Sequence, residues 1–269
     1  MSFIGSSFNF NNISSERFGL KITTPETKST INISSYKSNL IKTPRRSKFY
    51  ATKRIVDEPL VLNISIFSET PLTRNQIDRI EDWLFGGDDE FKKLRINQED
   101  LKGYYYNCRL QKLESETFGN VPYICHAVME CDSHFMWQSL QTRVFNITST
   151  PTNFKFVNIS SEDTLKPTYI IKAGMTYGLM GGELLNNRYI KITNQTTNEY
   201  MELNNLLDNE TIIIDTEYEI ITSDMRTSGL LDLFNKNFIR LQKGKHEFLI
   251  EGNIIEFKIT YQNARKFGN

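Results

Sequence analysis

Alanine is scarce in this chain of 269 residues, and its scarcity argues against a mostly helical protein. Only four alanines occur, whereas asparagine, isoleucine, threonine, serine, phenylalanine and tyrosine are plentiful. Alanine is the strongest helix former, and β-branched and aromatic residues favour strands. The composition therefore predicts a mostly β protein, and the length is sufficient for a buried core without disulfide bonds.

The chain also lacks an excess of charge, a long apolar run and a large set of cysteines. Its 32 basic and 32 acidic side chains give a formal net charge of zero, which argues against a general nucleic-acid binder. The most apolar stretch, residues 169–185, is interrupted by Lys172, four glycines and Glu183, so no membrane-spanning helix is expected. Three cysteines and the lack of a secretory-signal pattern in the first twenty residues predict a protein made in a reducing cytoplasm.

The first half of the chain combines strand patterns with one helix. Apolar residues alternate with others over residues 60–67, the period-two pattern of a half-buried strand. Thr73 and Gln76 form a capping-box pattern at the start of a helix over about residues 73–85, which ends at Gly86. Further strands are expected over residues 93–97, 104–113 and 121–131.

After Trp137 the pattern changes to short strands separated by turns. Strands are expected over residues 154–157, 169–172, 189–193, 211–215, 218–221, 238–241, 246–250 and 254–261. We expect Gly252-Asn253 to join the last two as a hairpin, and Lys243-Gly244-Lys245 to form a similar turn between the preceding pair. Many short strands of this kind predict a β-sandwich or jelly roll. The polar segment 138–153 then separates two domains, residues 1–138 and 139–269.

Cys125, His126, Cys131 and His134 superficially resemble a set of zinc ligands, but their spacing argues against a metal site. On a strand over residues 121–131 the odd positions form one apolar face, so both cysteines are expected in the core. His126 would then point to the opposite face, and no C-x-x-C pair occurs. We therefore expect no metal ligands.

Motifs of catalysis are lacking as well. No G-x-S-x-G elbow occurs, and the three histidines lie in strand contexts without a partner motif. His246 is expected to be a surface residue, and the acidic run Asp88-Asp89-Glu90 is interpreted as a solvated loop after the helix. The sequence therefore predicts no catalytic residue and no cofactor.

Two loops remain as candidate binding segments. A basic run comprises Lys42, Arg45, Arg46, Lys48, Lys53 and Arg54. A solvated loop is its simplest interpretation, and the alternative is contact of Arg45, Arg46 and Lys48 with an acidic surface on a partner or neighbouring subunit. The glycine-rich segment 174–182 lacks the ending of a phosphate loop and is interpreted as a flexible connection or a ligand loop, with Tyr177 and Tyr189 as exposed aromatic rings.

Several short motifs follow one another in an informative order. In the first half they cover residues 3–8, 17–20, 43–46, 60–67, 80–84, 94–96, 103–106 and 129–132. In the second half they cover residues 157–158, 167–170 and 241–244. This order, spread over nearly the whole chain, resembles the distal tail protein (Dit) family of long-tailed, siphovirus-type phages. One departure is Arg45-Arg46 after Pro44, where relatives often carry a glycine after the proline.

The resemblance implies a fold, an assembly and a location. The fold is an amino-terminal tail-tube-like β domain with one helix and a carboxy-terminal galectin-like β-sandwich. The assembly is a homo-hexameric ring that joins the tail tube protein to the tail-tip, baseplate and receptor-binding proteins. The location is the virion tail tip, after assembly in the bacterial host cytoplasm.

Two other functions are weighed against this structural hub. The first is a host adsorption module, in which the second domain binds a cell-wall saccharide through rings such as Tyr177 and Tyr189. The second is a wall-degrading glycosidase, for which the sequence offers no favoured carboxylate pair. We expect a protein that is not an enzyme.

Overall fold

The chain folds into two compact units that consist mainly of β-strands. The computed structural model describes residues 6–23, 36–37, 40–42, 49–51, 55–56, 59–119, 121–175, 179–180, 183–184 and 189–266. The first unit is formed by residues 1–138 together with residues 265–269, and the second unit spans Ser139–Ala264. The mostly β class predicted from the composition is confirmed.

The last strand of the chain returns to the first unit, which differs from the predicted second domain of residues 139–269. β26 (Ala264–Lys266) pairs with β12 (Phe135–Gln138), a strand of the first unit. Arg265 and Lys266 are therefore grouped with the first unit. The sequence pattern could not indicate this return, because it reports which segments form strands and not which distant strands pair.

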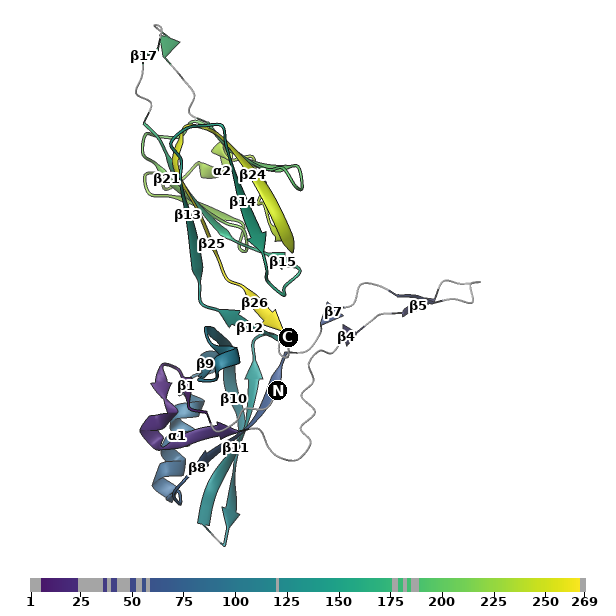
Figure 1. Ribbon diagram of the computed structural model, residues 1–269, viewed down its shortest axis with the longest axis vertical. Coiled ribbons are helices and arrows are strands. Elements are labelled where there is room, and N and C mark those ends of the chain that lie inside the picture. The colour runs from purple at the N-terminus through teal and green to yellow at the C-terminus, as the bar shows by residue number, and fades with distance from the viewer. Residues whose placement is uncertain are drawn as a thin grey trace. The chain divides into compact units, whose positions relative to one another are not determined.

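The first unit is built on an antiparallel sheet whose strands follow the order β2-β1-β9-β10-β11-β8-β3 (Figure 1). They are β1 (Phe8–Phe10), β2 (Ile13–Ser14), β3 (Leu20–Thr23), β8 (Val61–Ser68), β9 (Lys92–Ile96), β10 (Tyr104–Phe118) and β11 (Val121–Cys131). The 3-10 turns η1 (Ser15–Phe18) and η2 (Glu99–Leu101) connect β2 to β3 and β9 to β10. Two short antiparallel pairs join β4 (Tyr36–Lys37) to β7 (Ile55–Val56) and β5 (Leu40–Lys42) to β6 (Phe49–Ala51).

The predicted helix is α1 (Arg74–Phe85), which lies along one face of this sheet (Figure 1). Its first turn is closed by a capping box, because the Gln76 backbone N–H donates to Thr73 Oγ1 and the Thr73 N–H donates to Gln76 Oε1. Gly86 ends the helix in the left-handed conformation, with φ 73°. Both ends of the helix are confirmed where the sequence placed them.

Trp83 is the aromatic centre of the first core. Its ring stacks on Phe18 and Phe8, with centroid distances of 4.7 and 5.5 Å, and meets Phe10 edge-on at 6.3 Å. The indole N–H donates a 3.1 Å hydrogen bond to the carbonyl oxygen of Phe10. Only 7% of Trp83 is exposed. One side chain thereby connects α1 to both β1 and η1.

The second unit is a sandwich of two antiparallel sheets (Figure 1). One has the order β13-β25-β16-β21-β22: β13 (Gln141–Asn146), β25 (Ile254–Tyr261), β16 (Thr168–Ala173), β21 (Thr211–Asp215) and β22 (Ile220–Ser223). The other has the order β14-β24-β19-β20: β14 (Thr152–Asn158), β24 (Gly244–Gly252), β19 (Ile190–Asn194) and β20 (Glu199–Leu203). The remaining elements are the pair β15 (Thr164–Leu165) and β23 (Leu241–Gln242), the pair β17 (Leu179–Met180) and β18 (Glu183–Leu184), and α2 (Leu230–Leu233).

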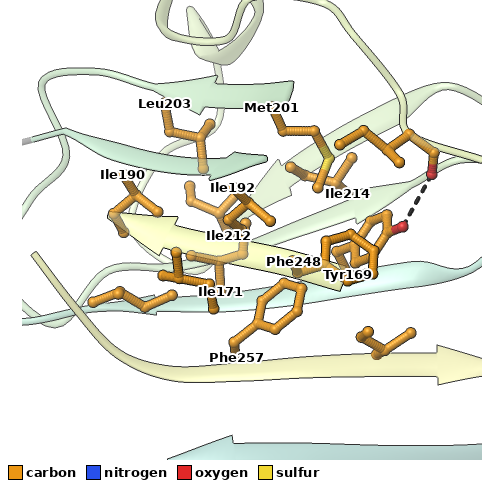
Figure 2. Close-up of a cluster of buried hydrophobic side chains, with 14 of the residues drawn as sticks. Tyr169, Ile171, Ile190, Ile192, Met201, Leu203, Ile212, Ile214, Phe248 and Phe257 are labelled. Carbon is orange, nitrogen blue, oxygen red and sulfur yellow. Dashed lines mark hydrogen bonds between the residues drawn. The ribbon is translucent and has the colours of Figure 1, made fainter. Parts of the chain in front are cut away.

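The two sheets bury one shared core. Figure 2 shows Ile171 and Phe257 from the first sheet near Ile192 and Phe248 from the second. Tyr169 is fully buried among them, and burial raises the pKa of its hydroxyl well above the ordinary value. The hydroxyl therefore stays protonated and donates a 3.1 Å hydrogen bond to the carbonyl oxygen of Ile239, the dashed line in Figure 2. The predicted sandwich is confirmed.

The predicted hairpins at Gly252-Asn253 and at Lys243-Gly244-Lys245 are wrong. β24 and β25 lie in different sheets, so Gly252-Asn253 carries the chain from one sheet to the other. Gly252 has φ 96°, and a Cβ there would collide with the carbonyl oxygen of Tyr189. The other turn also separates strands that do not pair, since β23 pairs with β15 and β24 with β14 and β19. Alternation indicates which face a residue buries, but not which strand is its neighbour.

The elements that the sequence pattern did not predict include β12, β13, β20 and α2. β13 lies in the segment interpreted as a polar connection, because an edge strand with one exposed face carries mostly polar residues. α2 has only four residues, too few for a helical period to be read.

An ion pair between a buried carboxylate and a partly buried guanidinium lies at one end of the second core. Glu210 is fully buried; its Oε1 accepts from Ser223 Oγ and its Oε2 accepts from the backbone N–H of Leu207, both at 2.7 Å. The Arg226 guanidinium spans the carboxylate, with Nε 3.0 Å from Oε1 and Nη2 3.1 Å from Oε2. Nη2 also donates to the carbonyl oxygen of Asn205 at 2.6 Å. The pair thereby joins the chain before β21 to the chain after β22.

Replacing Trp83 with alanine should destabilise the first unit by about 3–5 kcal/mol, because it removes a buried ring from three aromatic contacts. Trp83→Phe keeps a ring but loses the indole hydrogen bond, so its cost should be smaller, about 1–2 kcal/mol. The measurement is urea unfolding of the full chain. Phe85→Ala, an exposed position on the same helix, is the matched control and should change stability by no more than about 0.5 kcal/mol. An unchanged unfolding curve for Trp83→Ala would contradict the observed packing.

Glu210→Gln should destabilise the second unit by about 1–3 kcal/mol, because the amide removes the counter-charge of the partly buried Arg226 guanidinium. Thermal and urea unfolding measure the loss, with the exposed Glu199→Gln as control. The double variant Glu210→Gln/Arg226→Met removes both charges and should recover some of the loss. Equal stabilities for Glu210→Gln and the control would show that the ion pair is not a structural requirement.

Candidate interaction site

The structure describes only one of the five residues predicted for the two binding loops. Arg45, Arg46 and Lys48 fall between β5 and β6 and lie outside the described residues, as does Tyr177. Tyr189 lies just before β19, is partly buried, and accepts a 3.0 Å hydrogen bond from the N–H of Asn253 at its carbonyl oxygen. Partner contact by the basic loop and ligand binding by the glycine-rich loop thus stay predictions.

The cysteine and histidine positions follow the predicted two faces of β11. Cys125 and Cys131 are buried in the first core. His126 lies on the other face, with Nδ1 2.9 Å from Ser65 Oγ and Nε2 2.8 Å from Glu116 Oε2. Within the described ranges, no three histidine, cysteine or acidic side chains are grouped so that they could hold a metal ion. The interpretation of both cysteines as core residues is confirmed.

His246 is buried, so its assignment to the surface was wrong. Its Nε2 donates to the carbonyl oxygen of Gln242 at 2.7 Å, which leaves Nδ1 to accept from the side-chain amide of Asn194 at 3.1 Å. The sequence could have predicted this burial. His246, Phe248 and Ile250 occupy alternate positions of β24, and alternate residues of a strand point to the same face.

A cationic surface covers Tyr105 on the outer face of the first sheet. Lys93 Nζ lies 4.8 Å from the centre of the Tyr105 ring, and the Arg95 guanidinium lies 5.6 Å from it. Both cations stand on β9, at alternate positions that point away from the core. Cations over an aromatic face are attracted by its quadrupole, by about 0.5–1 kcal/mol at exposed sites. Tyr105 is thereby buried without belonging to the core cluster.

The returning C-terminal strand places another cation near the start of β10, on the core side of the strand where Tyr104 lies, opposite to Tyr105. The Arg265 guanidinium lies 5.4 Å from the centre of the Tyr104 ring, and its Nη1 donates a 2.9 Å hydrogen bond to the carbonyl oxygen of Asp100. Tyr104 and Tyr105 begin β10, so the cations gather where the chain passes from β9 through η2 to β10. No sequence pattern could place Arg265 here, because 165 residues separate it from Asp100.

A pocket of about 340 Å³ lies at the same turn, and we call it the basic pocket. The polar side chains of its lining are Arg95, Asn97, Gln98, Glu99, Lys102 and Tyr104. The charged side chains of the lining are one carboxylate, Glu99, and two cations, Arg95 and Lys102. Gln98 Oε1 is buried and has no hydrogen-bond partner among the described residues.

An acidic segment precedes β9, and we call residues 88–90 the acidic turn. Asp88 Oδ1 accepts from the Glu90 N–H at 3.1 Å, and Lys92 Nζ bridges Asp88 and Glu90 at 2.9 and 3.1 Å. The Lys92 hydrogen bond, with that N–H, lowers the pKa of Asp88 below its ordinary value. The Asp89 carboxylate has no hydrogen bond or ion pair with any described residue, while the Asp89 carbonyl oxygen accepts a 3.5 Å hydrogen bond from Arg109 Nη1. The turn therefore has a fixed shape and an unpaired negative charge at its centre.

Two family models match the chain. Residues 3–133 match a model described as a phage tail protein N-terminal domain, and residues 135–261 match one described as a phage tail C-terminal domain. No curated protein matches the sequence.

Solved structures share the fold at low sequence identity. The Dit protein (gp 19.1) of phage SPP1, described as a paradigm of the hub adsorption apparatus in phages that infect Gram-positive bacteria, is 10% identical with a TM-score of 0.68. The alignment covers 95% of this chain and 98% of that chain. Two structures of the phage P2 baseplate in its activated conformation, with Ca and with Sr, are 9% and 10% identical with TM-scores of 0.49 and 0.48. They cover 98% and 97% of this chain, and 100% and 99% of the matched chains.

The similarity to the SPP1 protein shows a shared fold. Membership of a family is shown by the two family models. Together these models span nearly the whole sequence. The resemblance indicated by the order of the short motifs is confirmed. The chain belongs to the phage tail proteins and has the fold of a distal tail (Dit) protein.

Proposed function

We propose that this protein is a structural hub of a phage tail tip. Six copies form a ring that joins the tail tube to the tail tip or baseplate and to the receptor-binding apparatus. The observation that carries the proposal is a whole-chain match to two phage tail domains, together with the fold of the SPP1 Dit protein, which is described as a paradigm of a hub. The ring is assembled in the host cytoplasm and is located at the tail tip of the virion.

The two units have different roles in this proposal. Residues 1–138, with the returning strand β26, make the ring as a tail-tube-like domain. Residues 139–264 form the galectin-like sandwich that docks partner proteins.

The separation of positive and negative charge on the surface of the first unit supports a ring. A ring of identical subunits is built from heterologous contacts, in which two different surfaces of the chain meet. The first unit carries a cationic surface with Lys93 and Arg95, and a separate acidic turn. Opposite charges on two surfaces of one chain favour a head-to-tail contact and disfavour a like-to-like one.

The outer face of the second unit supports partner docking. Ile170 on β16 and Ile213 on β21 are direct neighbours in one row, and Lys258 on β25 separates them from Val144 on β13. Val144 is 50% exposed and Ile213 is 39% exposed. Neighbouring apolar side chains on an exposed sheet face, as at Ile170 and Ile213, are typical of surfaces that other proteins cover.

The alternative of saccharide binding gains no support from the described residues. It depended on Tyr177 and Tyr189; the first is not described, and the second is partly buried. The proposal also assigns no enzymatic activity. Neither helix in the described ranges has the length and apolar character that crossing a membrane would need.

Light scattering on the purified chain should give six times the 31.4 kDa mass of one chain, and negative-stain images should contain six-fold rings. The measurement should cover a wide range of protein concentration and salt. It should be repeated with the tail tube protein present, because some rings form only on their neighbours. A chain that stays monomeric in all these conditions would contradict the hub proposal.

A further inference from the structure

We propose that the acidic turn of one copy docks into the basic pocket of the next copy, as the head-to-tail contact of the assembly. This inference rests on the proposed ring and names the two surfaces that meet in it. The partner is thus a second copy of this chain, recognised by the carboxylates of residues 88–90.

The charges of the two surfaces are complementary. The pocket presents Arg95 and Lys102 against the single carboxylate of Glu99, and Arg265 lies against Tyr104 in its lining. The acidic turn has three carboxylates, of which Lys92 pairs with two. The unpaired Asp89 carboxylate is therefore the group with most to gain from a cationic pocket.

The dimensions and rigidity of the two surfaces agree. A pocket of about 340 Å³ is at the small end of the range for bound ligands, about 300–1,000 Å³. Lys92 and the Asp88–Glu90 hydrogen bond already hold the turn in shape. Docking therefore orders little additional chain, which lowers its entropic cost.

One copy cannot bring its own acidic turn into its own basic pocket. The turn leads directly into β9 (Lys92–Ile96), and the pocket lies at the other end of that strand. An extended strand rises about 3.3 Å per residue, so β9 keeps the two surfaces roughly 16 Å apart. The contact must then form between copies, with a different surface from each, which is the type of contact that closes rings.

Charge reversal tests the contact in the full-length chain. Lys102→Glu and Asp89→Lys should each raise the protein concentration needed for half-assembly by about tenfold, and the combined variant should restore it. Lys245→Glu, at an exposed position of the second unit, is the matched control and should assemble as the unchanged chain does. Unfolding curves check that each variant folds. Assembly that does not respond to Lys102→Glu would overturn this inference and leave the ring proposal intact.

Cysteine cross-linking tests the same contact even if assembly is weak. The chain Asp89→Cys/Lys102→Cys, oxidised with glutathione disulfide, should form a disulfide between neighbouring copies and give a ladder of multimers. The three native thiols are buried and should not react. The matched control is Asp89→Cys/Lys245→Cys. A ladder that ends at six supports both proposals, and a ladder that continues supports the contact while contradicting the closed ring. A ladder no stronger than that of the control would overturn the contact.

Discussion

The packing of Trp83 positions much of the first unit. Its ring lies between Phe8 and Phe18, and its N–H is bonded to Phe10, so the end of α1 cannot shift relative to β1. The helix ends two residues later, and Gly86 turns the chain toward β9. The acidic turn, β9 and the basic pocket follow in sequence, and β9 is held in turn by its pairing with β1 and β10.

The second unit achieves its order in another way, through buried polar groups that all have specific partners. Glu210 and Arg226 join the ends of β21 and β22, and His246 joins Asn194 to the chain before β24. A buried polar group without its partner is costly, so each of these pairs favours one register over its alternatives. Apolar alternation alone would tolerate a strand shifted by two residues, whereas these pairs would not.

Local sequence patterns predicted much of the fold. The wrong predictions concern strands that pair with segments distant in the sequence. The Thr73–Gln76 capping box and the inward period of β11 depend on neighbours within a few residues, so the sequence was sufficient for both. The crossing at Gly252 and the place of Arg265 depend on strands distant in sequence, and no local period contains that information. The basic pocket was missed for the same reason, while the buried side of His246 could have been predicted from its strand.

The zero net charge acquires a physical meaning in an assembly of identical copies. Repulsion between subunits grows with the square of their net charge, so a neutral chain can gather in several copies without accumulating a long-range penalty. Neutrality alone provides no attraction. Attraction requires that the opposite charges lie on different surfaces, as the Asp89 carboxylate and the cations around Tyr105 do. A neutral chain with separated charges thus favours neighbours in one orientation, because only the head-to-tail arrangement brings unlike surfaces together.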